Sequence, residues 1–192
     1  MKVAPRSRPG RPRDPRLDEA IVLAADQLLR ERGYANMSIE AVAALAGTTV
    51  PSVRRRHPGK AALAIAAVDS LRVDPLTLGD GPPRERALAI LENFERNLRR
   101  PNLIALLATL LAEEERTPEL MRRFRARLAG PRRRALREAL ELGVEEGQLP
   151  GDLDADAAEN MLIGAFYARY VSTGSIPRNW ARRVLGQIWP PG

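Results

Sequence analysis

The sequence predicts an all-α fold of about nine helices, and three observations lead to this prediction. Ala, Leu, Arg and Glu dominate the 192 residues, and these side chains lose little rotamer freedom in a helix. Apolar residues recur every three or four positions along most of the chain, and no segment shows strand-like alternation. Three prolines and two glycines interrupt this period between residues 73 and 83. We therefore expect two helical domains, 14–72 and 84–192, joined by a linker at 73–83.

The first domain is expected to contain four short or medium helices. They are predicted at 15–32, 38–45, 49–56 and from Pro58 to about Leu71. Asp14, Ser38 and Thr49 fit the N-cap positions of the first three, because their side-chain oxygens can accept from free backbone N–H groups. Gly33 and Gly47 fit the ends of the first and second helices. Residues 1–13, rich in Pro and Arg, are predicted to form a disordered arm.

The second domain is expected to consist of longer helices. They are predicted at 84–99, 102–115, 117–146, 155–172 and from Pro177 to the C-terminus. The segment 102–115 is apolar almost all round, which predicts a helix buried on every side. Gly130-Pro131 should kink or break the longest helix. Asp154 fits the N-cap of the helix that follows it.

Composition excludes several classes of function. The chain has no cysteine and one histidine, which excludes thiolate metal sites and the paired Glu-x-x-His motifs of di-iron bundles. No nucleophile motif accompanies the histidine, so we expect no enzyme, no metal and no cofactor. No apolar run approaches the roughly 18 residues of a membrane span, and no secretory signal is recognisable. These features favour a cytoplasmic protein without a membrane partner.

The positive charge is concentrated at one end of the chain. Residues 1–60 contain 12 Lys and Arg against 6 Asp and Glu, whereas residues 61–192 contain 19 against 18. Most of the net charge of +7 therefore belongs to the first third. Neutralised phosphates supply much of the affinity for nucleic acids, so this distribution favours a nucleic-acid partner. A solvated basic tail is the alternative.

The two short helices at 38–45 and 49–56 have the spacing of a helix-turn-helix. Gly47 fits the turn, and Ala43 and Val53 fit the contacts between the helices. Short amphipathic pairs are also common in all-α cores, so the neighbouring residues decide. These are Gly33-Tyr34, Ser38-Ile39, Val42-Ala43-Ala44-Leu45-Ala46-Gly47 and Arg54-Arg55-Arg56-His57-Pro58-Gly59-Lys60. With this spacing, the stretch from Leu17 to Leu71 resembles the TetR/AcrR family of bacterial regulators.

The resemblance implies a homodimer that binds a palindromic double-stranded DNA operator, usually as a repressor, and releases it when a small molecule binds the second domain. It implies phosphate contacts for Ser38 and Lys60. It places the DNA-facing end of the recognition helix at Thr48, Thr49, Val50, Pro51 and Ser52. Arg54 replaces a usual Tyr, and it could bind phosphate or guanine; Arg55 adds to this arginine-rich end.

The arm provides further candidates for DNA binding. Arg8, Arg11 and Arg13 lie in a Gly-Arg-Pro-rich segment of the kind that enters narrow minor grooves. The alternative is a screened tail that gives only non-specific affinity. A second basic run, at 122–134, is predicted to be a solvated face, with Arg134 paired to Glu138 and Arg137 to Glu141.

The last two helices carry the predicted dimer interface. It comprises Ala157, Met161, Gly164, Ala165, Ala168, Trp180, Val184, Ile188 and Trp189, and core packing within one chain is the alternative. A pocket for an apolar or weakly polar ligand is predicted from Phe94, Asn97, Leu106, Thr109, Leu110, Met121, Phe124, Phe166 and Tyr170, each of which also fits an ordinary core. An architectural DNA-binding protein without an effector remains an alternative function, and a ligand-binding bundle or enzyme a more remote one.

Overall fold

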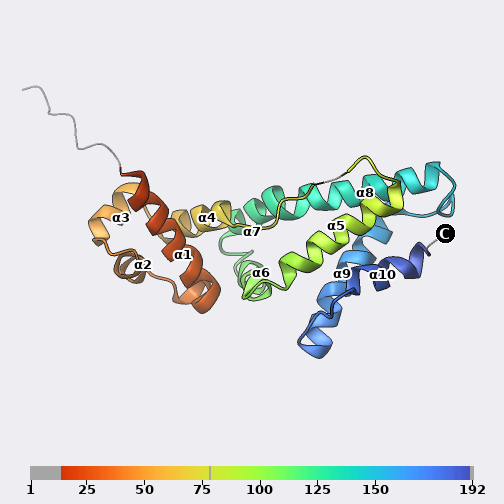
Figure 1. The fold of residues 1–192 in the computed structure, drawn as a ribbon. Helices are drawn as coiled ribbons and strands as arrows, with labels where there is room; N and C mark the ends of the chain where they lie inside the picture. Colours follow the sequence, from red (N-terminus) through yellow and green to blue (C-terminus); the bar gives the residue numbers. More distant parts are fainter. Residues whose placement is uncertain (1–13, 78, 191–192) are drawn as a thin grey trace, which may run out of the picture.

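The computed structural model describes residues 14–77 and 79–190, and the regular elements in these ranges are all helices (Figure 1). They are α1 (Pro15–Asn36), α2 (Ile39–Leu45), α3 (Val50–Arg56), α4 (Lys60–Ser70), α5 (Pro83–Leu98), α6 (Leu103–Ala112), α7 (Pro118–Phe124), η1 (Arg125–Ala129), α8 (Gly130–Glu145), α9 (Ala155–Thr173) and α10 (Trp180–Ile188). The segments α7, η1 and α8 form one continuous run, so the described residues form nine helices, which confirms the predicted class.

The molecule is elongated, with α1, α2 and α3 at one end and α9 and α10 at the other (Figure 1). We call residues 14–70 the N-terminal lobe and residues 83–190 the C-terminal lobe. Local sequence determines where helices begin, as predicted. The Asp14 carboxylate accepts from Arg16 N at 3.0 Å at the start of α1, and that of Asp154 accepts from the first free amides of α9.

The N-terminal lobe is built around α1, which packs against α2 and α4. Its core contains Ile21, Leu28, Val42, Val53 and Leu63, all buried. Gly33 has φ of +74°, a left-handed conformation that ends the regular part of α1, as the sequence predicts. The turn that follows lies beside Thr109 of α6, so the end of α1 also contacts the C-terminal lobe.

The C-terminal lobe packs α5 along α8, and α10 lies against α5 and α9 (Figure 1). Its buried core includes Leu91, Leu120, Leu136 and Phe166. The expectation that the segment at 102–115 is buried on every side is wrong. Only one face of α6 is buried, and Leu111 on the other face is 53% exposed, because α1, α5 and α7 cover one side of the helix.

The chain does not break at Gly130-Pro131, but the regular α-helix is interrupted directly before these residues by a π-helical turn. In this wider turn the N–H of Gly130 donates to the carbonyl of Arg125, and the helical run continues to Glu145. A Cβ atom at position 130 would lie only 2.8 Å from the Arg125 carbonyl, so this register requires glycine. Insertions of this type are frequent at functional sites, and this one contributes Leu128 and Ala129 to a cavity described below.

Candidate nucleic-acid interface and ligand cavity

The helices α2 and α3 form a helix-turn-helix whose geometry follows from its caps and its turn. The hydroxyls of Ser38 and Thr49 accept from Ala41 N at 3.1 Å and Ser52 N at 3.3 Å, which satisfies one free amide at each helix start. Gly47 has φ of +64°, which L side chains rarely adopt. The buried side chains of Val42 and Val53 hold the two helices on the lobe core.

The exposed side of α3 carries most of the residues expected at DNA. Pro51, Arg54 and Arg55 are exposed, as is the capping residue Thr49. Thr48, Val50 and Ser38 are half-buried. Arg54 forms a long ion pair on this face, 3.9 Å from Glu40, and both side chains are largely exposed. Two guanidinium groups are therefore presented at the end of the lobe and are free to bind an anion.

Ser52, which was predicted to lie at the DNA-facing end of the recognition helix, does not face solvent. Its side chain is buried, and its hydroxyl accepts from Arg56 Nη1 at 3.0 Å. Arg56 also binds the Asp18 carboxylate of α1, so the pair attaches the end of α3 to the lobe. Ser52 directly follows the exposed Pro51 in the helix. The sequence pattern alone does not show that one of these two side chains is buried and the other is exposed.

Lys60 lies where the resemblance places it, at the start of α4, but its ammonium group has intramolecular contacts. Its Nζ donates to the Ala35 carbonyl at 2.9 Å and lies 4.5 Å from the centroid of the Tyr34 ring. A phosphate contact would have to replace or share this hydrogen bond. Arg8, Arg11 and Arg13 lie outside the described residues.

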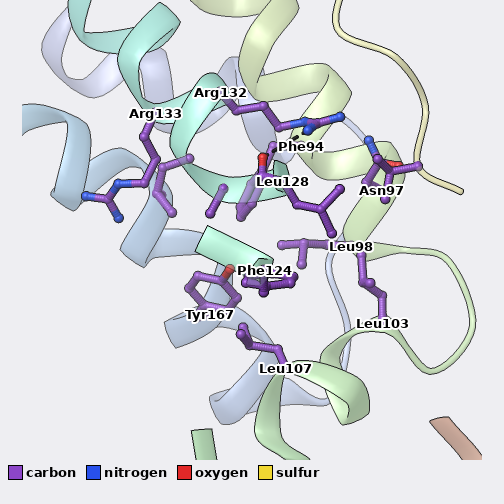
Figure 2. A pocket seen from close by; sticks show the side chains of 13 residues that line it. Phe94, Asn97, Leu98, Leu103, Leu107, Phe124, Leu128, Arg132, Arg133 and Tyr167 are labelled. Atoms are coloured by element: carbon purple, nitrogen blue, oxygen red, sulfur yellow. Dashed lines mark hydrogen bonds between the residues drawn. The ribbon is translucent and has the colours of Figure 1, made fainter. Parts of the chain in front are cut away.

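The C-terminal lobe encloses a cavity of about 90 Å³ among α5, α6, α8, α9 and the π turn (Figure 2). Its walls are mostly apolar. The polar residues in them are Asn97 of α5, Arg132 and Arg133 of α8, and Tyr167 of α9. The lining residues are Val73, Phe94, Asn97, Leu98, Leu103, Leu107, Phe124, Leu128, Ala129, Arg132, Arg133, Ile163 and Tyr167.

Three of the nine predicted pocket residues line this cavity, namely Phe94, Asn97 and Phe124. The other six predicted residues do not line this cavity. Leu106, Leu110, Met121 and Phe166 are buried in the core, Thr109 lies beside Gly33, and Tyr170 is exposed at a separate surface hollow. Five of these residues lie three positions from a lining residue on the same helix, so helical spacing alone does not separate them from the lining.

The charged residues at the cavity wall are paired with protein groups. Arg133 Nη2 donates to the fully buried Glu159 at 2.8 Å and to Asn160 at 2.6 Å. Burial raises the pKa of the Glu159 carboxyl, and the nearby Arg133 opposes this shift. Figure 2 shows the guanidinium groups of Arg132 and Arg133 directed away from the centre of the cavity, which receives mainly their aliphatic stems.

Tyr167 supplies the polar group that faces the cavity. Its hydroxyl points toward the space in Figure 2 and has no hydrogen bond to another described residue. Burial raises its pKa to about 12, while the charge of Arg133 acts in the opposite direction. The hydroxyl is therefore protonated at physiological pH and can donate a hydrogen bond to a guest molecule.

The basic run at 122–134 is only partly a solvated face. Arg132 and Arg133 turn inward to the cavity wall. Arg137 binds Asp156 at 2.5 Å and lies 3.7 Å from Glu159, so its expected pairing with Glu141 is wrong. Tertiary partners on α9 replace the partner expected one turn along the same helix.

The helix α9 presents a stripe of small and apolar residues to solvent. Ala157, Met161 and Ala168 are exposed, Gly164 and Ala165 are half-buried, and Met161 is 66% exposed. On α10, Trp180, Val184 and Ile188 are half-buried and pack partly against the chain's own core. Trp180 Nε1 donates to the Ala165 carbonyl at 3.2 Å. Trp189 does not belong to the predicted interface, because it is buried against Gly143 of α8, inside the chain's own core.

Comparison with known families decides the class of protein. Residues 21–67 match the family described as "Bacterial regulatory proteins, tetR family", and residues 79–188 match "Tetracyclin repressor-like, C-terminal domain". The chain belongs to the TetR family. TetR-family proteins are DNA-binding transcriptional regulators and not enzymes, which confirms the predicted function class.

Similar proteins include two bacterial regulators of comparable length. The chain is 27% identical over 169 residues to the uncharacterized HTH-type transcriptional regulator YdeS of Bacillus subtilis, covering 88% of this chain and 85% of that one. It is 26% identical over 171 residues to the uncharacterized HTH-type transcriptional regulator Mb1581 of Mycobacterium bovis, covering 88% and 83%.

Solved structures show the same TetR-family fold. The chain aligns with MexZ of Pseudomonas aeruginosa, described as a key repressor responsible for antibiotic resistance, with a TM-score of 0.67 and 22% identity over 89% of this chain and 90% of that one. It aligns with HlyIIR, a Hemolysin II transcriptional regulator, with a TM-score of 0.64 and 17% identity over 91% and 98%.

Within residues 14–77 and 79–190, no group of three or more His, Cys, Asp or Glu side chains could hold a metal ion. In the same ranges, no helix combines the length and the apolar character that crossing a bilayer requires.

Proposed function

We propose that this TetR-family regulator binds a palindromic operator as a homodimer and represses transcription until a small molecule enters the cavity of its C-terminal lobe. The observation that carries the DNA-binding surface is the exposed end of α3, with Thr49, Pro51, Arg54 and Arg55. Arginine pairs well with phosphate and with the O6 and N7 atoms of guanine. Ser38 and Thr48 border this surface, and Lys60 can add a phosphate contact by leaving the Ala35 carbonyl.

The dimer is proposed to form through the exposed stripe on α9 together with Trp180, Val184 and Ile188. Ala157, Met161, Gly164, Ala168 and Val171 follow each other at alternating spacings of four, three, four and three residues, which places them on one face. Val171 is 85% exposed in the single chain, so a partner would remove an apolar surface from water. A two-fold axis there would place the two α3 helices about 34 Å apart, one turn of DNA.

The proposed effector is a small, uncharged and largely apolar molecule that carries one hydrogen-bond acceptor. The apolar lining sets its general character, and the neutral Tyr167 hydroxyl would bind the acceptor. Both wall arginines already have partners, so a charged head group would have to compete with Glu159 or with the groups that Arg132 binds. The modest volume of about 90 Å³ favours a small ligand.

Selection of bound sequences from random double-stranded DNA with the purified full chain tests this function. We expect enrichment of an inverted repeat whose half-sites lie about 10 base pairs apart, centre to centre. Binding without an enriched motif would contradict operator recognition and would favour an architectural DNA-binding protein. A single enriched half-site would contradict the dimer but not the α3 surface.

A further inference from the structure

Side chains of the C-terminal lobe hold the linker between the two lobes at Asp74 and at its neighbour Pro75, whose carbonyl accepts from Asn93 Nδ2 at 2.9 Å. The backbone N–H of Asp74 donates to Asn97 Oδ1 at 2.8 Å, and its carbonyl accepts from Arg132 Nη2 at 2.8 Å and Asn93 Nδ2 at 3.2 Å. Its carboxylate binds Arg100. We call Asn93, Asn97, Arg100 and Arg132, together with Asp74, the Asp74 clamp.

The two asparagines of the clamp are buried, whereas its ion pair between Asp74 and Arg100 is partly exposed. Asn93 is 2% exposed and Asn97 is 5% exposed, and Asn97 Nδ2 donates to Asn93 Oδ1 at 3.1 Å. Arg132 Nε donates to the same Asn93 oxygen at 3.1 Å. Breaking one of these bonds leaves a buried polar group without a partner, which is costly. The network therefore favours a fully formed or a reorganised arrangement over a gradual distortion.

The clamp also forms part of the cavity wall. Asn97 and Arg132 line the cavity, and so does Val73, the residue before Asp74. Arg132 Nη1 donates to the carbonyl of Leu128, which belongs to the π turn and lines the same space. A molecule that enlarges the cavity toward α5 and α8 must therefore push on the side chains that hold the linker (Figure 2).

On its other side, the clamp leads to the DNA-binding lobe by a short path. Asp74 is four residues after Ser70, the last residue of α4, and α4 packs against α1. Arg100 Nη1 donates to the carbonyl of Arg72 at 2.7 Å, and Arg72 pairs with Glu19 of α1 at 3.0 Å. A displacement of Asp74 is thus passed along the chain to α4, and the exposed pair of Arg72 and Glu19 adds only a weak link to α1.

We propose that the Asp74 clamp sets the orientation of the N-terminal lobe, and that an occupant of the cavity opens the clamp by displacing Asn97 or Arg132. Arg132 and Asn97 are then positioning residues, which act on DNA binding through Asp74 and α4. This inference rests on the proposed ligand response and adds its route. Asn97 and Arg132 both line the cavity and hold the linker at Asp74.

The test measures the separation of the two DNA-binding lobes in the dimer without DNA. The chain has no cysteine, so a single Arg32→Cys substitution allows one spin label to be attached to α1 of each protomer. Double electron–electron resonance spectroscopy then gives the distance between the two labels in the dimer. Gln148→Cys, in the turn between α8 and α9, gives a reference distance within the C-terminal lobes. A distance that is measurable at either position also shows independently that the chain dimerises.

Two variants disturb the clamp in different ways. Arg132→Met keeps the apolar stem and removes the donors to Asp74 and Asn93, and Leu107→Phe fills the cavity from α6 without altering any clamp residue. Arg134→Met, an exposed arginine two positions further along α8, is the matched control. Circular dichroism and thermal unfolding establish that each variant is folded, and Leu107→Phe decides the outcome if Arg132→Met does not fold.

We expect either clamp variant to shift or broaden the label distance at position 32 while the distance at position 148 stays at its wild-type value. We also expect at least a tenfold loss of affinity for a selected operator. Arg134→Met should change neither. Folded variants that keep the wild-type distance at position 32 would overturn the proposal, as would an equal shift at position 148. Because these distances are measured without DNA, they are informative even if operator recognition fails.

Discussion

The guanidinium group of Arg56, at the end of α3, binds the carboxylate of Asp18 on α1. The Arg56 side chain is 12% exposed, and its Nη1 also donates to the Ser52 carbonyl at 3.1 Å. The pair therefore attaches the recognition helix to the longest helix of the N-terminal lobe. It is a structural arginine, in contrast to its exposed neighbours Arg54 and Arg55.

The first prediction concerns this pair. Asp18→Ala should lower the free energy of unfolding by about 1–2 kcal/mol, because it leaves a mostly buried guanidinium without its charged partner. Glu19→Ala is the control, since Glu19 and Arg72 are both largely exposed, and we expect a loss below about 0.5 kcal/mol. Urea unfolding measures both values. Equal losses would show that Arg56 is not anchored by Asp18.

The second prediction concerns the N-terminal arm. Residues 1–13 contain five Lys and Arg, including Arg8, Arg11 and Arg13. Their deletion should weaken operator binding and lower the slope of log affinity against log salt concentration by up to about 4, because fewer counterions are released. Fluorescence anisotropy across a salt series gives this slope. An unchanged affinity and slope would exclude the arm from the DNA complex.

The third prediction concerns the dimer. Met161→Arg places a charge on the exposed stripe of α9 and should convert the dimer into monomers, because the buried interface would enclose an unpaired charge. Leu111→Arg is the control, since Leu111 is also exposed but lies on α6. Sedimentation velocity distinguishes the two states. A Met161→Arg protein that remains dimeric would place the interface elsewhere.

The fourth prediction uses the protonation of Tyr167. Its pKa is raised from near 10 to about 12 in the folded protein, so the folded state retains this proton in a range where the unfolded chain loses it. Tyr167 therefore contributes stability below pH 10 that disappears as the pH rises to about 12. Tyr167→Phe should remove this part of the loss in an alkaline unfolding series.

Titration of tyrosinate absorbance checks the assignment directly. The chain has three tyrosines, and wild type should show one late-titrating group that Tyr167→Phe lacks. Tyr170→Phe is the control, because Tyr170 is exposed at the surface. Loss of the late group in the Tyr170 variant instead would contradict the burial of the Tyr167 hydroxyl in the cavity.

Features set by neighbouring residues could be predicted from the sequence, and features set by distant residues could not. Asp14, Ser38 and Thr49 cap their helices as expected, because an N-cap depends on amides only two or three residues away. The sequence predicts a solvated face for Arg132, yet its partner Asp74 is 58 residues away in the chain. Trp189 follows the apolar spacing predicted for the interface, but its ring packs directly against Gly143, which has no side chain to prevent this contact.

The cavity illustrates the same limit. The sequence predicts Phe94 and Phe124 in its lining but not Tyr167, although Tyr167 directly follows the predicted residue Phe166 in α9. The choice between these neighbours depends on the rotation of α9 about its axis, which is fixed by contacts with α8 and α10. A cavity-facing hydroxyl without an internal partner is visible only after this packing is known.

The central claim is that the exposed end of α3 binds the operator, and the most direct test is the operator affinity of a double variant at this surface. Arg54→Ala with Arg55→Ala is compared with Arg116→Ala and Arg134→Ala, which removes the same charge from exposed arginines of the C-terminal lobe. We predict at least a tenfold loss for the α3 variant, about 1.4 kcal/mol or more, and less than about a threefold loss for the control at the same salt concentration. Equal losses in the two variants would contradict the claim, because they would show that α3 contributes only general positive charge.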